Sequence, residues 1–358
     1  MSKLLDTRLT RALGCDVPVI QTAMGWVATP SLVIASVNAG AFGFLAAAVM
    51  TPDECERAVI QIKQAVAARP FGVNFHSFQP GAERIVDICI DHGVRAVSYG
   101  RSPSTKLIEK LKEAGILCVP TIGAGKHAQK AVDLGADIIV CQGGEGGGHT
   151  GDTPTWLLLA QTLDAVGADV PVAAAGGFRD GRGLAAALAF GADGIAMGTR
   201  FLLTSDSPTP EETKARYLQA SVTEIPVSTA LDGLPQRMVM NETLAALEQS
   251  GKLMMLVRAL KHGMAFRKVT GASLTDMIKT AWAMASKTDM TLGQTMMAGN
   301  APVIIQKAMV DGKPDEGVLP SGQVAGLIDD LPDCATLIND IVTGAEARLK
   351  AIGQTDAV

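Results

Sequence analysis

The sequence has few aromatic residues, no apolar run long enough to cross a bilayer and no block of basic residues. Phe, Trp and Tyr together make up 4% of the 358 residues. The N-terminus lacks the apolar stretch of a signal peptide, so we expect a cytoplasmic protein without a membrane-spanning segment. The formal net charge is −5. In the absence of a Lys/Arg block, this charge argues against a nucleic-acid partner.

Paired cysteines are also missing. The chain has no CxxC pair and no Cys/His cluster at metal-ligand spacing, which argues against zinc and iron–sulfur sites. A disulfide scaffold is not expected in a chain of this size. We therefore interpret most of the cysteines as small core residues. They are Cys15, Cys55, Cys89, Cys118, Cys141 and Cys334.

The length allows a sizeable core, either in one large α/β barrel with an appendage or in two domains of medium size. The 38 glycines, together with many alanines, suit tight turns and close packing of helices on a sheet.

Eight short apolar runs follow one another through the first two hundred residues. Each is too short for a helix and lacks strict alternation, which is typical of a strand buried on both faces. The runs are Pro18–Met24, Phe42–Ala48, Phe71–Phe75, Arg95–Gly100, Ile116–Ile122, Asp137–Gln142, Pro171–Gly176 and Gly194–Gly198.

Helical segments lie between these runs, among them Pro52–Ala68, Ser104–Ala114 and Arg182–Phe190. Several connections read as a helix end, a capping glycine and a new strand, as in Asn38–Gly43 and Ala189–Gly194. Strict βα alternation over eight strands predicts a (β/α)₈ TIM barrel. A doubly wound open sheet is the alternative. It normally carries a GxGxxG turn after the first strand, and Gln21–Ala28 has none.

The pattern changes after about Arg200. A loop, Ser205–Lys214, leads into a capped helix, and Glu242–Ala298 is predicted to be entirely helical and is rich in Met. A final helix is expected at Cys334–Leu349. We thus predict a barrel in residues 1–204 and a helical lid or substrate region over the barrel mouth in 205–330. Residues 331–358 are expected to form a C-terminal helix that packs back on the barrel.

Functional groups of a βα barrel collect where its strands end. Two such positions, Gly176-Gly177 and Gly198-Thr199, follow the last two strands. Glycines let backbone N–H groups approach a phosphate, and a helix N-terminus favours the anion, so we predict a phosphate site there. Glycines that only make tight turns are the alternative. Ala23, Met24, Gly25, Asn74, Lys126 and Gln142 also follow predicted strands.

The run Gly143–Asp152, GGEGGGHTGD, is the most informative segment. It looks too glycine-rich to be packed structure, and its glycines would let the backbone lie against a flat ring. His149 is the one histidine of five in such a loop, and imidazole suits proton transfer near neutral pH. Glu145 is a candidate second acid/base, with a solvent-facing carboxylate as the alternative.

Several segments together resemble the nitronate monooxygenase family, formerly called 2-nitropropane dioxygenases. They are QTAMGWVA, FGVNF, EGGGHTGD, AAGGFRDGRGLAAALAFGADGIAMGTRFL and VLPSGQVAGLI. The family also includes flavin-dependent enoyl-thioester reductases and a NADH:quinone reductase branch. Its steroid-degradation branch, which acts on ring-derived CoA thioesters, resembles GTRFLLTSDS and GVLPSGQVAGLIDDLPDC.

The resemblance implies an FMN-binding barrel with His149 as the acid/base. The positions that match the family's cofactor site are Ala23, Met24, Gly25, Asn74, Lys126, Gln142, Gly147, Gly176, Gly177, Gly198 and Thr199. Candidate substrate contacts are Trp26, His76, Arg258, Lys261, Ser321 and Gln323. Among these, Arg258 and Lys261 belong to a basic, apolar segment that would hold CoA phosphates or simply form a solvated helix face.

Three enzymatic functions follow from the resemblance. The first is an FMN-dependent C–C dehydrogenase or reductase acting on a steroid-ring-derived CoA thioester. The second is a nitronate monooxygenase that uses O₂, and the third is an NAD(P)H:quinone or enoyl-thioester reductase, with NAD(H) as co-substrate. The alternative to these enzymatic functions is a non-catalytic flavin carrier. We expect a small-molecule substrate, a nitronate or an acyl-CoA-like thioester, and allow for a homodimer.

Overall fold

The computed structural model describes residues 3–100, 102–249 and 301–354. These residues form two compact units. The first contains the described residues up to Gly146, Thr150–Pro208 and the described residues from Leu327 onward. The second contains Gly147–His149 and the described residues of Thr209–Gly326.

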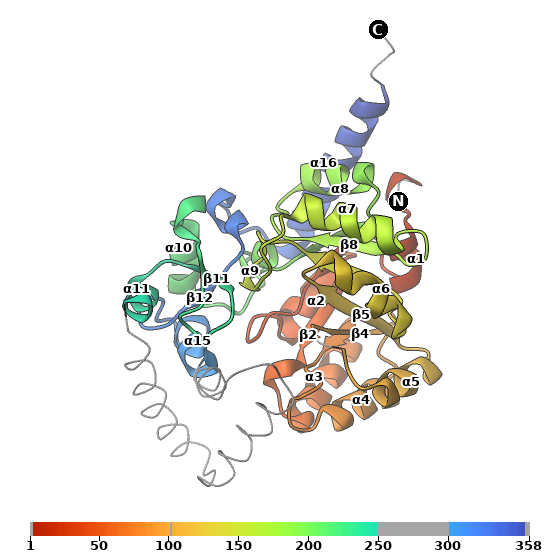
Figure 1. Ribbon diagram of the computed structural model, residues 1–358, viewed down its shortest axis with the longest axis horizontal. Helices are drawn as coiled ribbons and strands as arrows, with labels where there is room; N and C mark the ends of the chain where they lie inside the picture. Colours follow the sequence, from red (N-terminus) through yellow and green to blue (C-terminus); the bar gives the residue numbers. More distant parts are fainter. Residues whose placement is uncertain (1–2, 101, 250–300, 355–358) are drawn as a thin grey trace. The chain divides into compact units, whose positions relative to one another are not determined.

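Eight parallel strands of the first unit form a closed barrel, with helices around its outside (Figure 1). The strands are β1 (Val19–Gln21), β2 (Phe42–Ala46), β3 (Gly72–Asn74), β4 (Ala96–Tyr99), β5 (Leu117–Ile122), β6 (Ile139–Gln142), β8 (Val172–Ala175) and β9 (Gly194–Met197). Closure is visible at Ile20 of β1, which aligns with Phe42 of β2 and with Ala196 of β9. The predicted TIM barrel is confirmed, and each of the eight apolar runs contains one strand.

The strands are mostly apolar because the barrel buries both of their faces. Every residue of β2, β4, β8 and β9 is buried. Inside the barrel, the rings of Phe42 and Phe44 meet edge to face with centroids 5.1 Å apart. A Cβ at Gly72 would lie 2.3 Å from Phe44 Cε1, so this position has room only for glycine. The interior is thus a packed core and no channel.

Four helices of the first unit, α1, α3, α8 and α16, begin at a side chain that caps them. Thr51 and Glu54 form a reciprocal capping box ahead of α3, with Pro52 in the first turn. The helices are α1 (Arg8–Leu13), α2 (Pro30–Asn38), α3 (Pro52–Ala65), α4 (Ala82–Asp91), α5 (Thr105–Glu113), α6 (Ala128–Asp133), α7 (Thr155–Val166), α8 (Gly181–Phe190), α9 (Thr199–Leu202) and α16 (Cys334–Gly353). Short 3₁₀ turns are η1 (Lys3–Leu5), η2 (Ala47–Val49) and η3 (Gly125–His127).

Glycines end these helices as the sequence predicts. Gly40, Gly115, Gly135 and Gly191 follow helices with φ of +98°, +72°, +99° and +108°. Only glycine adopts this left-handed conformation without steric cost. Each then passes directly to the next strand.

Helix α1 closes the amino-terminal end of the barrel. Leu9 and Leu13 join the interior apolar cluster. The Arg8 guanidinium donates to both carboxylate oxygens of Asp193, at 2.8 Å each, just before β9. This hydrogen bonding raises the pKa of Arg8. With the amino-terminal end closed, the carboxyl-terminal rim remains for a ligand.

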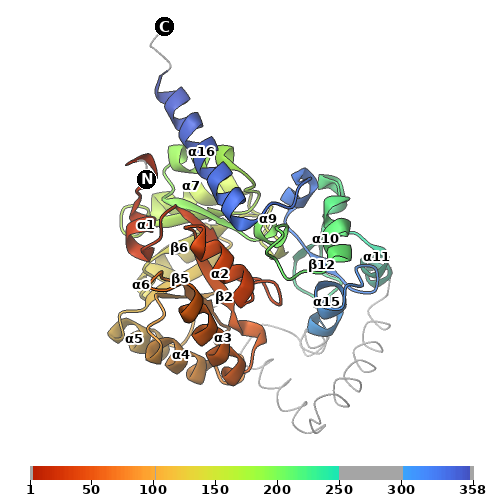
Figure 2. The same cartoon turned by 180° about the vertical axis from the view of Figure 1, so that it is seen from behind.

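Helix α16 packs against α8 and α2 (Figure 2). It begins at Asp333, whose carboxylate accepts the Thr336 N–H at 2.7 Å. Contact with α8 is so close that a Cβ at Gly181 would lie 2.4 Å from Ala345 N and 2.5 Å from Ile341 O. The C-terminal helix is therefore fitted to the barrel through a glycine.

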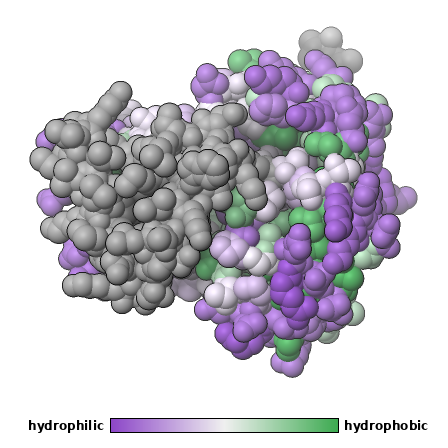
Figure 3. Space-filling view, turned by 60° about the horizontal axis from the view of Figure 1, so that its bottom comes forward, coloured by the Kyte–Doolittle hydropathy of each residue, from purple (hydrophilic) through white to green (hydrophobic). Residues whose placement is uncertain are grey.

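The outer surface of the barrel unit has the polarity of an ordinary globular protein. The face in Figure 3 is mostly hydrophilic over the barrel unit, with apolar side chains scattered among polar ones. Among the described helices, none has the length and apolar character needed to cross a bilayer.

Five cysteines are buried and Cys15 is partly buried. Burial raises the pKa of Cys141 to about 12, so its thiol stays protonated. The expectation of core cysteines is confirmed.

The second unit contains helices and short strands among the residues that the structure describes. Its described helices are α10 (Glu211–Leu218), α11 (Glu242–Glu248) and α15 (Ala301–Met309), with 3₁₀ turns at Val222–Glu224 and Gln323–Leu327. It also contains a small antiparallel sheet of β10 (Val227–Ser228), β11 (Gln236–Val239) and β12 (Leu319–Pro320), to which β7 (Gly148–His149) adds through β11. The helical segment that the sequence predicts at Glu242–Ala298 is described only as far as Gln249, and the rest of it lies outside the described residues.

The close contact between α8 and α16 predicts unequal effects of two alanine substitutions. Gly181→Ala should lower the free energy of unfolding by about 1–3 kcal/mol because its new methyl meets backbone atoms. Gly344→Ala, on the facing helix, would place its methyl 3.5 Å from Gly181 Cα, an ordinary contact. It should be neutral or stabilise by up to about 1 kcal/mol. Urea unfolding measures both, and equal destabilisation by the two variants would contradict the close-contact account.

Candidate active site

Most of the predicted site residues lie at the carboxyl-terminal rim of the barrel. All strand ends of one kind meet at one rim of a closed parallel barrel, so residues distant in sequence surround the same opening. In chain order they are Ala23, Met24, Gly25, Trp26, Asn74, His76, Lys126, Gln142, Gly176, Gly177, Gly198 and Thr199. Gly147, His149, Ser321 and Gln323 belong to the second unit. Arg258 and Lys261 lie outside the described residues.

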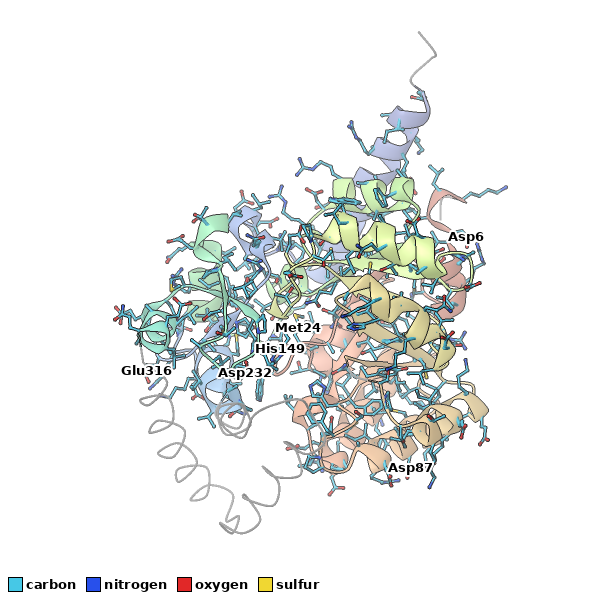
Figure 4. All side chains as sticks on the ribbon, in the orientation of Figure 1. Asp6, Met24, Asp87, His149, Asp232 and Glu316 are labelled. Carbon is cyan, nitrogen blue, oxygen red and sulfur yellow. The ribbon has the colours of Figure 1, made fainter. Side chains whose placement is uncertain are left out.

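The loops after the first and last barrel strands touch each other. The Thr22 N–H donates to Met197 O at 3.1 Å. A Cβ at Gly198 would lie 3.0 Å from Thr22 Oγ1 and 3.3 Å from Met24 Sδ. Met24 is labelled in Figure 4. The predicted ring-binding and phosphate-binding segments are therefore adjacent at this part of the rim.

The first rim loop contains a strained residue. Trp26 has φ +61°, a left-handed conformation that is rare for a bulky side chain. The carbonyl of Met24 holds the turn by accepting the N–H groups of Val27 and Ala28, at 3.1 and 2.9 Å. Two hydrogen bonds thus hold the turn that contains Trp26.

Two polar side chains stand at other positions on the rim. Asn74 Nδ2 donates to the carbonyl and the hydroxyl of Ser98, at 3.0 and 3.1 Å, which fixes the orientation of its carboxamide. Lys126 lies in η3 and is exposed. In the described part of the chain, no carboxylate forms an ion pair with its ammonium group. Lys126 is therefore a cation that can meet an anionic ligand.

His76 is exposed at the rim after β3. Its ring stacks on Phe78, with centroids 5.0 Å apart and planes 7° from parallel. Its backbone N–H donates to Gln79 Oε1 at 2.8 Å. The side chain thus forms part of an exposed aromatic pair.

The glycine run after β6 is tightly packed, and the expectation of an unpacked loop was wrong. Gly143 and Gly146 are buried. A Cβ at Gly143 would lie 2.3 Å from Thr155 Cα, and one at Gly146 would lie 2.7 Å from Gln142 Cγ. Side chains at these two positions would therefore collide with Thr155 or with the side chain of Gln142.

Glu145 caps helix α7. Pro154 precedes this helix and makes no side-chain cap. Instead, one carboxylate oxygen of Glu145 accepts the N–H and the hydroxyl of Thr155, at 2.9 and 2.6 Å. The Thr155 hydroxyl also contacts Gly176 O at 3.1 Å. Glu145 therefore joins the loops that follow β6 and β8, a role that neither sequence interpretation anticipated.

The Gly176-Gly177 pair forms a backbone surface suited to an anion. Both glycines are left-handed, with φ of +104° and +83°. Their N–H groups donate no hydrogen bond within the residues that the structure describes. A Cβ at Gly177 would meet only Glu145 Cβ, at 3.6 Å. Consecutive unused N–H groups of this kind bind phosphate oxygens, so the residues present fit a flavin phosphate.

The charges at the start of α8 are balanced. Asp180 caps this helix by accepting the Arg182 N–H at 3.0 Å. The hydrogen bond from the Arg182 side chain lowers the pKa of Asp180, which is held as a carboxylate. Arg179 also contacts it, at 3.4 Å. This ion pairing offsets the negative charge beside the glycine pair.

In the second unit, His149 pairs with a carboxylate. His149 Nε2 lies 2.8 Å from Asp232 Oδ2, and the two side chains point toward each other in Figure 4. The imidazole is 59% exposed, whereas the Asp232 side chain is 5% exposed. A buried carboxylate orients an imidazole and stabilises its protonated form, as acid–base catalysis requires.

Other predicted residues of the second unit are packed. A Cβ at Gly147 would lie 2.5 Å from Gly322 N, so this glycine allows close approach of two backbones. Ser321 is buried and its hydroxyl donates to Gly322 O at 2.9 Å. Gln323 begins the 3₁₀ turn Gln323–Leu327 and is half-buried.

The role of Glu145 predicts a matched pair of effects. Glu145→Ala should lower the free energy of unfolding by about 1–2 kcal/mol because the N-terminus of α7 loses its cap. Asp152→Ala removes a carboxylate from the same loop, but Asp152 is exposed, and the change should stay within about 0.5 kcal/mol. Denaturant unfolding of the two variants measures the difference. A destabilisation that is the same for both would mean that general charge, and no specific cap, acts at this helix.

Comparisons with known proteins identify the family of the chain. The family model for nitronate monooxygenase matches residues 6–85 and 79–344. The chain is 47% identical over 349 residues to a Rhodococcus jostii protein and 48% identical over 347 residues to one of Mycobacterium tuberculosis. Both are named (3aS,4S,5R,7aS)-5-hydroxy-7a-methyl-1-oxo-octahydro-1H-indene-4-carboxyl-CoA dehydrogenase. The first alignment covers 98% of each chain, and the second covers 97% of this chain and 98% of the relative.

A solved structure has the same fold. FabK from Thermotoga maritima superposes with a TM-score of 0.78 at 28% identity, covering 97% of this chain and 98% of that chain. The family match extends over most of the sequence, and the two relatives align over almost their full lengths. The chain therefore belongs to the nitronate monooxygenase family and is a flavin-dependent oxidoreductase.

Proposed function

We propose that the chain is an FMN-dependent dehydrogenase that acts on the CoA thioester of a bicyclic, steroid-ring-derived acid. The observation that carries this proposal is the 47–48% identity, over nearly the whole length of both chains, to two proteins named as dehydrogenases of such a thioester. The family supports the flavin, and the paired imidazole and carboxylate of His149 and Asp232 support acid–base chemistry.

FMN is the flavin that the rim residues suit. The unused N–H groups of Gly176 and Gly177, together with Gly198 and Thr199 at the start of α9, would hold its phosphate. We assign Ala23, Met24 and Gly25 to the face of the ring, and Asn74, Lys126 and Gln142 to its polar edge. The exposed ammonium of Lys126 would offset negative charge on the bound cofactor. Trp26 and His76 remain proposed substrate contacts.

The substrate named for the relatives carries its hydroxyl one carbon from the carbon that bears the thioester. The thioester acidifies the C–H between the two groups, and His149 would accept that proton. FMN, when bound, supplies the acceptor for the hydride from the hydroxyl-bearing carbon. Loss of this proton and hydride leaves an enol, which is the tautomer of a β-keto thioester. Dehydrogenation of the C–C bond therefore gives the same product as oxidation of the alcohol.

Nitronate oxidation is the second candidate because the family model is that of nitronate monooxygenase. The imidazole of His149 would act here as well, because forming or stabilising a nitronate also involves a proton on the carbon next to an electron-withdrawing group. A reductase that takes electrons from NAD(H) is the third. The three candidates differ in which compound delivers electrons to the flavin.

Anaerobic mixing of the FMN-loaded protein with one reductant at a time separates these functions. We expect the hydroxylated bicyclic CoA thioester to abolish the oxidised-flavin absorbance, and free CoA to leave it unchanged. His149→Gln should slow this reduction about 10²–10⁴-fold without altering FMN binding, because only proton transfer is lost. Reduction by propyl-2-nitronate or by NADH, with none by the thioester, would replace the proposal with the second or third candidate.

A further inference from the structure

Another residue of the second unit, Asp232, holds the imidazole of His149 through its carboxylate. The Asp232 carboxylate is buried, and each of its oxygens accepts a hydrogen bond from the second unit's own chain. Oδ1 accepts the Leu234 N–H at 3.0 Å, and Oδ2 accepts the Gln236 side-chain amide at 2.6 Å. Gly233, with φ +81°, makes the turn that brings the Leu234 N–H back to the Asp232 carboxylate. The carboxylate is therefore fixed in place, and its remaining contact is with the imidazole.

The strand register brings these groups together. His149 aligns with Gln236 across the antiparallel pair of β7 and β11. Gln236 is buried and reaches the same carboxylate oxygen that contacts His149 Nε2. Residues 83 positions apart in the sequence thus form a chain from amide to carboxylate to imidazole. The backbone ladder places His149 opposite Gln236, and the side chains of both contact the same carboxylate oxygen.

This chain of contacts determines the tautomer of the imidazole. An ionised carboxylate only accepts hydrogen bonds, so Nε2 carries the hydrogen that it shares with Oδ2. The basic lone pair of the neutral ring is then on Nδ1. When the ring takes up a second proton, the nearby carboxylate stabilises the resulting cation.

We propose that Asp232, held by Gln236, is the positioning residue for His149. It would keep the hydrogen on Nε2, make Nδ1 the atom that exchanges a proton with the substrate, and stabilise the imidazolium formed in that step. This inference rests on the proposed acid–base role of His149. An Asp that only shapes its own turn would leave the tautomer of His149 unaffected.

The tautomer is measured directly by ¹⁵N NMR of the histidine side chains in the FMN-loaded protein. The chain has five histidines, and the His149 signal is assigned by its loss in His149→Gln. We expect the Nε2–H form in the wild type and a larger Nδ1–H fraction in Asp232→Asn, since the asparagine amide can donate to Nε2. An Nδ1–H form in the wild type overturns the inference whatever the enzyme's substrate. This readout is therefore independent of the proposed function.

Kinetics supply the second readout. Asp232→Asn should slow single-turnover flavin reduction about 10²–10⁴-fold, with substrate affinity changed less than about threefold. Gln236→Met, which leaves the carboxylate, should slow the step about three- to tenfold and keep the Nε2–H tautomer. If Asp232→Asn does not fold, this variant and the wild-type tautomer still decide the matter.

The chain offers a matched control in another histidine–carboxylate pair. His92 Nε2 lies 3.3 Å from Glu56 Oε1 on the outer helices of the barrel. Glu56→Gln should leave the rate and the His149 tautomer unchanged. An equal effect of Glu56→Gln and Asp232→Asn, or an Asp232→Asn rate within twofold of the wild type, would contradict the positioning role. The second result would leave the proposed function intact.

Discussion

Closure of the parallel barrel is the constraint on which the rest of the structure depends. Strand β1 pairs with both β2 and β9, so the first and last strands of the barrel lie side by side. All eight strands run in the same direction, and their carboxyl ends must therefore meet at one rim. The contact of Gly198 with Thr22 and Met24 is a direct consequence. Without closure, segments nearly two hundred residues apart would have no reason to form one surface.

The sequence predicted the barrel well because its signals are local. A strand buried on both faces is a short apolar run, and a glycine such as Gly191 marks the end of a helix. Helix ends were less exact: α3 stops at Ala65, whereas the pattern predicted Ala68. The glycine run Gly143–Asp152 was identified as important, but for the wrong physical reason. Two of its glycines, Gly143 and Gly146, make room for Thr155 and Gln142, and composition does not show how the chain folds back on these neighbours.

The partners of the candidate site residues were beyond sequence reasoning. Asp232 is 83 residues from His149, and the ladder that aligns them consists of strands of two and four residues. Such strands are too short to show a period, and antiparallel pairing between distant segments leaves no local mark. An Asp-Gly pair at Asp232-Gly233 indicates a turn, and nothing in it indicates an imidazole. The role of Glu145 was ambiguous for the same reason, because the Thr155 N–H that it caps is ten residues away.

The central claim is that the glycines at the ends of β8 and β9 bind the flavin phosphate, and the ratio of the dissociation constants for riboflavin and FMN tests it most directly. Several hydrogen bonds to a charged phosphate should make this ratio at least about 100. Gly176→Ala should bring the ratio close to one. Gly191 has a similar φ, +108° against +104° for Gly176, but it lies before a strand and not after one. Gly191→Ala should therefore preserve the ratio. Equal affinities for riboflavin and FMN in the wild-type protein would contradict the account.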